Sequence, residues 1–205
     1  MPLIKESSDE LNPPVVTSAF IAPTKRGRTS GDCVALAVAT CGVGLIPLAP
    51  GTWGSAVGVG IYLALVWAFG LVVRYAGAHD FLLPEGVIGA GFTASLLVVI
   101  VVACVAGTWA ATRAEKVLGR KDPGAVVVDE VAGQLIAFLF VPPGRWWWTI
   151  LVAFTAFRLF DIWKPYPIRR LESLGGGLGI MADDVLAGLY AAVLMSVLTT
   201  IYSLL

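Results

Sequence analysis

The sequence predicts an all-α protein, a polytopic membrane bundle of about five spanning helices plus one short interfacial or half helix. Hydrophobic residues make up 58% of the 205 residues, and charged residues only 14%. Soluble domains average about one quarter charged residues. The apolar residues also form runs close to the length of about 20 that a helix needs to cross a bilayer. Composition and run length therefore both favour an integral membrane protein.

Residues 1–30 form a polar segment rich in proline, serine and threonine, with Lys25, Arg26 and Arg28 near its end. A secretory signal peptide would place an apolar stretch earlier. We expect residues 1–30 to be a disordered cytoplasmic tail and residues 31–205 to be one membrane-embedded domain. The first apolar stretch, residues 33–50, is short and interrupted by glycine and proline. It predicts a half helix that enters the bilayer or an interfacial helix that lies on it.

Five later runs are long and apolar enough to be spanning helices. They are residues 53–73, 87–111, 126–143, 146–163 and 185–205. The bias of lysine and arginine predicts that the tail and the loops 112–125 and 164–184 face the cytoplasm. The loops on the other side carry little more than Arg74 and Arg145.

Charge and cysteine content exclude two classes of protein. The 14 basic and 14 acidic residues cancel, so no nucleic-acid partner is expected. The three cysteines, Cys33, Cys41 and Cys104, lie in apolar segments. An odd number in such surroundings argues against a disulfide framework.

Acidic residues gather at one depth of the predicted bundle. Asp129 and Glu130 begin a helix that leaves the cytoplasmic face, and Asp161 ends a helix that returns to it. Asp183 and Asp184 begin the last helix at the same face. The helix dipole favours acids at helix N-termini, which accounts for one or two of them. It accounts poorly for so many acids at the cytoplasmic ends of three predicted helices.

Converging carboxylates stay ionised together only when positive charge neutralises them. Mg²⁺ suits this role because it takes oxygen ligands and keeps positions open for water and phosphate. Arg158, Lys164, Arg169 and Arg170 lie in the same stretch and suit a phosphate group. The glycine-rich segment 174–179 is expected to form a loop that brings backbone N–H groups to phosphate. This combination predicts phosphoryl chemistry on a lipid headgroup.

Other hydrolase chemistries lack their residues in this sequence. No cysteine is followed at short range by an arginine, as cysteine phosphatases require, and His79 is the only histidine. The segment around Ser55 does not match the G-x-S-x-G nucleophile elbow, and no P-loop is present. A carboxylate site that holds a metal remains.

Four segments carry a family resemblance. They are "GVGLIPLAPGTWGSAVG" (42–58), "KDPGAVVVDEVAGQ" (121–134), "FRLFDIWKPYPIRRLE" (157–172) and "GGGLGIMADDVLAG" (175–188). Together they closely resemble the phosphatidylglycerophosphatase A family of bacterial inner-membrane lipid phosphatases. The resemblance implies Mg²⁺-dependent hydrolysis of phosphatidylglycerophosphate to phosphatidylglycerol and phosphate. It also implies an all-helical, multi-pass protein of the bacterial inner membrane that meets this lipid at the cytoplasmic face.

The charged and hydroxyl side chains of these segments are the candidate site residues. Metal ligands are expected among Asp129, Glu130, Asp183, Asp184 and Asp122. Catalytic carboxylates are expected among Asp129, Glu130, Asp161 and Asp184, and phosphate contacts from Arg158, Lys164, Arg169, Thr52 and Ser55. An arginine inside an apolar run is costly, so Arg158 should face the site or a carboxylate.

Structural alternatives exist for several of these residues. Asp122 could cap a helix, and Asp161 could form only a local ion pair with Lys164. Lys164, Arg169 and Arg170 could be no more than positive-inside anchors.

Two other functions compete with lipid phosphate hydrolysis. A phosphotransferase that uses CDP-alcohols would also be helical, metal-dependent and interfacial, but its D-G-x-x-A-R pattern is absent. An ion-coupled transporter also has acids in broken helices, but it places them near the midplane, whereas these acids lie at one edge. The sequence leaves open the number of metal ions, the oligomeric state, and whether water or an aspartate is the nucleophile.

Overall fold

The computed structural model describes residues 28–143, 147–171 and 175–205. Within these ranges the chain forms helices and connecting loops and contains no strand, which confirms the all-α prediction. The helices are α1 (Ser30–Thr40), α2 (Pro50–Ala78), α3 (Glu85–Leu118), α4 (Val128–Ala137), α5 (Trp148–Trp163), α6 (Ile168–Leu171) and α7 (Gly176–Leu204). Of the expected tail 1–30, all but residues 28–30 lie outside the described residues.

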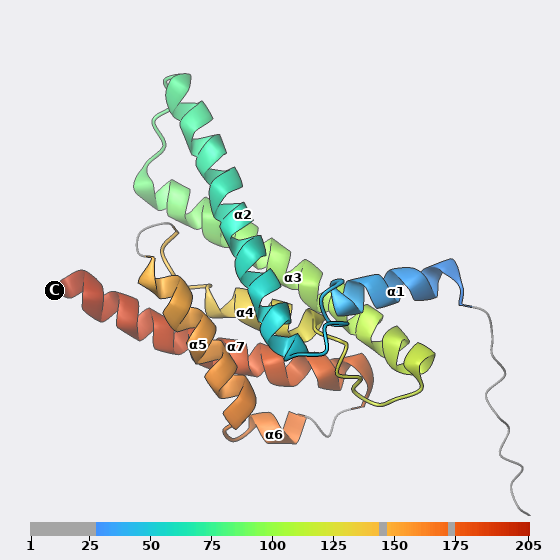
Figure 1. Ribbon diagram of the computed structural model, residues 1–205. Helices are drawn as coiled ribbons and strands as arrows, with labels where there is room; N and C mark the ends of the chain where they lie inside the picture. The colour runs from blue at the N-terminus through green and yellow to red at the C-terminus, as the bar shows by residue number, and fades with distance from the viewer. Residues whose placement is uncertain (1–27, 144–146, 172–174) are drawn as a thin grey trace, which may run out of the picture.

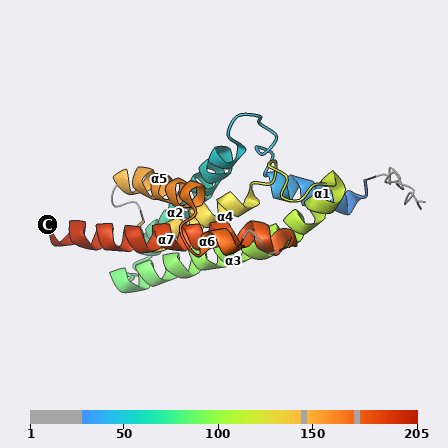
Figure 2. The ribbon, with the colours of Figure 1, turned by 90° about the horizontal axis from the view of Figure 1, so that it is seen from below.

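The short helix α4 lies at the centre of the bundle. It contacts α2, α3, α5 and α7. Figure 2 shows it enclosed between α2 and α5 on one side and α3 and α7 on the other. α1 packs against α3 at the edge of the molecule (Figure 1). This arrangement places the acidic first turn of α4 inside the bundle.

In the described part of the chain, three helices are long and apolar enough to cross a membrane: α2, α3 and α7. They have 29, 34 and 29 residues, which confirms the prediction of a helical bundle with helices apolar enough to span a membrane. The expected spans 126–143 and 146–163 contain α4 and α5, with only 10 and 16 residues. At 1.5 Å per residue, α4 is about 15 Å long, half the thickness of the hydrocarbon core. The count of about five spans is therefore not confirmed.

The apolar character of α4 comes from burial in protein. All of its residues except Glu130 are buried, and a helix that is hydrophobic all round is one that other elements surround. The helix ends at Ala137, with Phe138 as its C-cap, shortly before Pro142 and Pro143. An apolar run by itself does not distinguish a lipid-facing span from a buried helix.

Two helix boundaries differ from the sequence-based expectation. α3 continues through part of the expected loop 112–125 and ends at Leu118, with Gly119 in the left-handed C-cap conformation. α7 begins at Gly176, so residues 176–179 of the glycine-rich segment form the first turn of a helix and not the expected loop. Glycine is needed there for close packing: a Cβ at Gly177 would collide with the carbonyl of Thr108 on α3. As a result, Asp183 and Asp184 lie about two turns inside α7.

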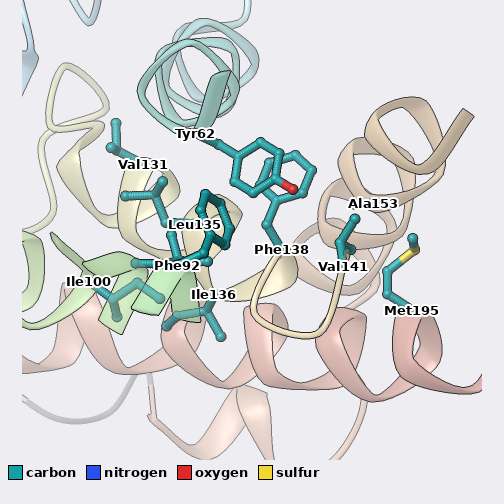
Figure 3. Packing of buried hydrophobic residues seen from close by; sticks show 11 residues of the cluster. Tyr62, Phe92, Ile100, Val131, Leu135, Ile136, Phe138, Val141, Ala153 and Met195 are labelled. Atoms are coloured by element: carbon teal, nitrogen blue, oxygen red, sulfur yellow. The ribbon is translucent and has the colours of Figure 1, made fainter. Parts of the chain in front are cut away.

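An aromatic cluster fixes α4 between its neighbours (Figure 3). Tyr62 of α2 stacks on Phe138 at the end of α4, with ring centroids 4.1 Å apart and an interplanar angle of 15°. Phe92 of α3 meets the Tyr62 ring edge-on at 5.9 Å. Such pairs contribute about 0.5–1.5 kcal/mol beyond the area they bury. The cluster anchors the C-terminal end of α4 and so orients its acidic first turn.

The short helix expected in residues 33–50 is present as α1. Its start is a capping box, in which the Thr29 and Asp32 side chains accept hydrogen bonds from each other's backbone N–H groups. Arg113 of α3 donates from Nε to Asp32 Oδ1 at 2.7 Å. This ion pair attaches the start of α1 to α3.

Candidate active site

Three carboxylates from two helices converge in the interior of the bundle. Asp129 and Glu130 occupy the first turn of α4, and Asp184 comes from α7. One oxygen of each lies within 4.8 Å of the others. Asp129 is 8% exposed and Asp184 only 3%. Like charges this close and this buried require a positive partner.

The pKa values of the two carboxyls on α4 also indicate that the cluster needs a positive partner. Burial raises the pKa of the Asp129 carboxyl well above its usual range, and the charges of Glu130 and Asp184 raise it further. Burial also raises the pKa of Glu130. Among the described residues, the buried oxygens Asp129 Oδ1 and Glu130 Oε2 have no hydrogen-bond partner. A small divalent cation would supply the partner that both oxygens lack.

Two further acids flank this cluster, each with a basic partner. Arg158 Nη1 lies 2.7 Å from Asp161 Oδ2 within α5, which confirms that Arg158 faces a carboxylate. Lys164 Nζ lies 2.7 Å from Asp183 Oδ2. The five acids thus divide into three that face one another and two that are ion-paired.

Glycine at the start of α2 allows the cluster to lie against that helix. A Cβ at Gly51 would collide with Glu130 Oε1 and would lie 2.9 Å from Arg158 Nη1. One turn later, a Cβ at Gly54 would lie 2.8 Å from the carbonyl oxygen of Val127. The backbone of α2 therefore closes one side of the site without any side chain between.

A cavity of about 600 Å³ opens onto these groups. Its acidic and basic lining residues are Glu115, Lys121, Asp122, Asp129, Glu130, Asp161, Lys164, Asp183 and Asp184. Asp129, Asp183 and Asp184 are buried, whereas Lys121, Asp122 and Gly124 are exposed. The cavity therefore runs from an exposed mouth to a buried acidic floor, and its volume falls in the range of small-molecule sites.

The structure brings most of the predicted site residues to this cavity. All five expected metal ligands line it, as do Asp161 and Lys164. Asp122 is not a helix N-cap, because Val127 occupies that position of α4. Arg158 reaches the site through its ion pair with Asp161.

Besides Arg158, three of the expected phosphate contacts, Ser55, Thr52 and Arg169, are not among the lining residues of the cavity. Ser55 is fully buried, and its hydroxyl donates to the Gly51 carbonyl at 3.0 Å. Thr52 and Arg169 are exposed on α2 and α6. Their role as phosphate contacts remains a prediction that this geometry does not support.

Two charged lining residues, Glu115 and Lys121, were not expected from the sequence. Glu115 Oε1 accepts a hydrogen bond from the backbone N–H of Asp122 at 3.0 Å. Gly119 is a residue type typical of a helix C-cap, so the sequence does indicate that α3 continues to residue 118. This adds two turns to the expected helix, and Glu115 lies on these turns at the cavity.

A comparison with known protein families agrees with this geometry. The model of the family "Phosphatidylglycerophosphatase A" matches residues 36–199, which is most of the chain. The chain belongs to the phosphatidylglycerophosphatase A family. Family membership confirms the resemblance seen in the sequence and the expectation of an enzyme, a phosphatase.

Relatives with assigned names support the same family. A Haemophilus influenzae phosphatidylglycerophosphatase A is 37% identical over 155 residues, covering 75% of this chain and 81% of the relative. The Escherichia coli phosphatidylglycerophosphatase A is 32% identical over 152 residues, or 74% of each chain. A Bacteroides thetaiotaomicron protein, provisionally named a phosphatidylinositol-3-phosphatase, is 41% identical over 160 residues, 76% of this chain and 87% of the relative. No solved structure matches this member of the phosphatidylglycerophosphatase A family significantly.

Proposed function

We propose that this chain hydrolyses phosphatidylglycerophosphate to phosphatidylglycerol and phosphate, with Mg²⁺ held by Asp129, Glu130 and Asp184. The observation that carries the proposal is the convergence of these three acids, within 4.8 Å of one another, in a chain of this family. Mg²⁺ prefers oxygen ligands and keeps coordination positions open for substrate oxygens. When bound, it supplies a positive charge that polarises the phosphate and acidifies water.

The residues of the chain perform the remaining tasks. Arg158 and Lys164 neutralise Asp161 and Asp183, which keeps the approach to the site from being wholly negative. The same two bases are placed to stabilise charge on the phosphate oxygens in the transition state. Asp161 lines the cavity beside the three-acid cluster and is suited to accept the proton of an attacking water. An aspartyl nucleophile is the alternative route.

The names of the relatives support a lipid substrate with a terminal phosphate monoester. Two are named for phosphatidylglycerophosphate and one, provisionally, for phosphatidylinositol 3-phosphate. Both lipids carry a phosphomonoester on a headgroup that a phosphodiester joins to the diacylglycerol. We propose phosphatidylglycerophosphate as the substrate, because the match to its family extends over residues 36–199.

The cytoplasmic face of the bacterial inner membrane is the proposed location. The basic segments 112–125 and 164–184 are predicted to face the cytoplasm. Both contribute to the cavity wall, through Lys121 and Lys164. The site and the positive charge thus share one end of the bundle.

Phosphate release from phosphatidylglycerophosphate by the detergent-purified protein tests this proposal. The assay compares Mg²⁺ with EDTA, and wild type with Asp129→Asn, Asp184→Asn and the control Asp80→Asn. Asp80 lies in the loop between α2 and α3, outside the cavity lining. Its positive φ of 59° is one that asparagine tolerates.

We expect Mg²⁺-dependent release by wild type and Asp80→Asn, and a loss of about 100-fold or more in the two cavity variants. Release that survives EDTA would contradict the metal site. No release from folded wild type, together with release from phosphatidylinositol 3-phosphate, would replace the substrate and keep the site.

A further inference from the structure

The cavity contains a second basic position that the reaction at its floor does not use. We propose that Lys121 binds the phosphodiester of the lipid headgroup and so selects substrates that carry a second phosphate beside the hydrolysed monoester. This inference rests on the proposed function, because it assigns the two phosphates of that substrate to two ends of the cavity.

The depth of the lining residues separates the two ends. Asp129 and Asp184, which would hold the cation, are 8% and 3% exposed. Lys121 is exposed on the wall of the same cavity. A monoester at the buried acids therefore leaves the rest of the headgroup directed toward the mouth, where Lys121 lies.

The two lysines of the cavity differ in what they already contact. Lys164 is bound to Asp183 at 2.7 Å and belongs to the floor of the site. Among the described residues, Lys121 has no ion-pair partner within 4.0 Å. It is the lysine at the mouth that can give its charge to a ligand.

The backbone around Lys121 is fixed, although its side chain is exposed. The next residue, Asp122, has a left-handed φ of 45° and donates its N–H to Glu115 Oε1 at 3.0 Å. Pro123 is buried, and its carbonyl accepts from Val126 N–H at 2.8 Å. The loop between α3 and α4 thus presents the lysine at a defined place on the cavity wall.

Charge at the mouth explains why a base is needed there. Glu115 and Asp122 line the cavity and lie side by side, joined by the hydrogen bond from the Asp122 N–H, and they repel any anionic headgroup. Of the basic residues near them in the sequence, Lys116, Arg120 and Lys121, it is Lys121 that lines the cavity. Without Lys121, the two acids would repel a diester that bears one negative charge; with it, the lysine can bind the diester at this place.

The test compares Lys121→Gln with a matched control, Lys116→Gln. Lys116 is an exposed lysine in the last turn of α3 and is not among the residues that line the cavity. The first readout is the KM and kcat for phosphatidylglycerophosphate in Mg²⁺. The second is calorimetric binding of short-chain phosphatidylglycerol, which carries the diester and no monoester and reports without turnover. The third is competitive inhibition by inorganic phosphate, which resembles the monoester and lacks the diester.

For Lys121→Gln we expect a KM about fivefold higher, a kcat close to wild type and phosphatidylglycerol binding weakened to the same extent. Inhibition by inorganic phosphate should not change, and Lys116→Gln should match wild type throughout. Unchanged phosphatidylglycerol binding in Lys121→Gln, or no binding by wild type, would overturn the assignment. An equal loss of affinity for inorganic phosphate and for phosphatidylglycerol in Lys121→Gln would also overturn it, because Lys121 would then contact the monoester. If the folded wild type releases no phosphate, the proposed function fails, and the phosphatidylglycerol titration still decides whether Lys121 binds a diester.

Discussion

Lys164 Nζ lies 2.7 Å from Asp183 Oδ2, and this ion pair joins the end of α5 to α7 beside the candidate site. Lys164 is the left-handed C-cap of α5, with a φ of 47°. Asp183 and Asp184 are adjacent, and adjacent side chains on a helix point about 100° apart. Asp183 is therefore bound by a base while Asp184 faces Asp129. One acidic pair in the sequence thus serves two different roles.

Replacing Lys164 by methionine should destabilise the protein by about 1–3 kcal/mol, because Asp183 would keep a mostly buried charge without its partner. The partial exposure of both side chains, 25% and 12%, keeps the loss below that of a fully buried pair. Thermal unfolding of the detergent-solubilised protein measures it. The double variant Lys164→Met with Asp183→Asn should recover part of the loss. If the losses of stability in the two single variants simply add in the double variant, the two side chains do not interact.

At Gly133, α4 packs closely against both α5 and α7. A Cβ there would collide with the Phe157 ring and lie 2.7 Å from the carbonyl oxygen of Asp184. Gly133→Ala should lower the free energy of unfolding by about 1–3 kcal/mol, and it should reduce phosphate release because α7 shifts at Asp184. Gly60→Ala is the control, since nothing lies within 4 Å of a Cβ at Gly60. A Gly133→Ala variant with wild-type melting temperature and activity would contradict this packing.

The class of fold follows from the sequence, but the length of its central helix does not. The run 126–143 is apolar in either case, because burial by α2, α3, α5 and α7 demands the same residues as contact with lipid. The burial of α4, Val128–Ala137, in which all residues but Glu130 are buried, shows that protein surrounds it. Local sequence contains no signal for those neighbours.

The candidate site was predictable where the charge pattern itself was unusual. Asp129, Glu130 and Asp184 stand out as acids in apolar surroundings, and the structure brings them together. Glu115 and Lys121 look like ordinary charged residues near a helix end, and only the fold carries them to the cavity wall. The hydroxyl of Ser55 was misleading because its bond to the Gly51 carbonyl is a local helical contact.

The Asp32–Arg113 pair makes the attachment of α1 depend on pH. The hydrogen bond from Arg113 is the largest cause that lowers the pKa of Asp32 from 3.8 to about 2. A lowered folded-state pKa contributes stability that is present above the unfolded value and is lost as pH falls through about 2. Asp32→Asn should therefore melt below wild type at pH 7, and the difference should shrink between about pH 4 and pH 2. Arg113→Met should show the same trend; a difference that persists unchanged at pH 2 would show that another contact stabilises α1.

Mg²⁺ should stabilise the protein without substrate, and more strongly as pH rises. Burial raises the pKa of Asp129 and of Glu130, so the metal-free protein holds protons that the unfolded chain releases. Without metal, stability should then fall as pH rises above the unfolded-state pKa of about 4.

Binding of Mg²⁺ requires the ionised carboxylates, so its apparent affinity should rise over the same pH range. The gain in melting temperature between EDTA and saturating Mg²⁺ should accordingly grow from pH 5 to pH 8. At a concentration 100-fold above Kd, the stabilisation is about 2.7 kcal/mol. Asp129→Asn should abolish most of this gain and Asp80→Asn none of it. A gain that is equal in Asp129→Asn, or that declines with rising pH, would place the cation away from the acids of α4.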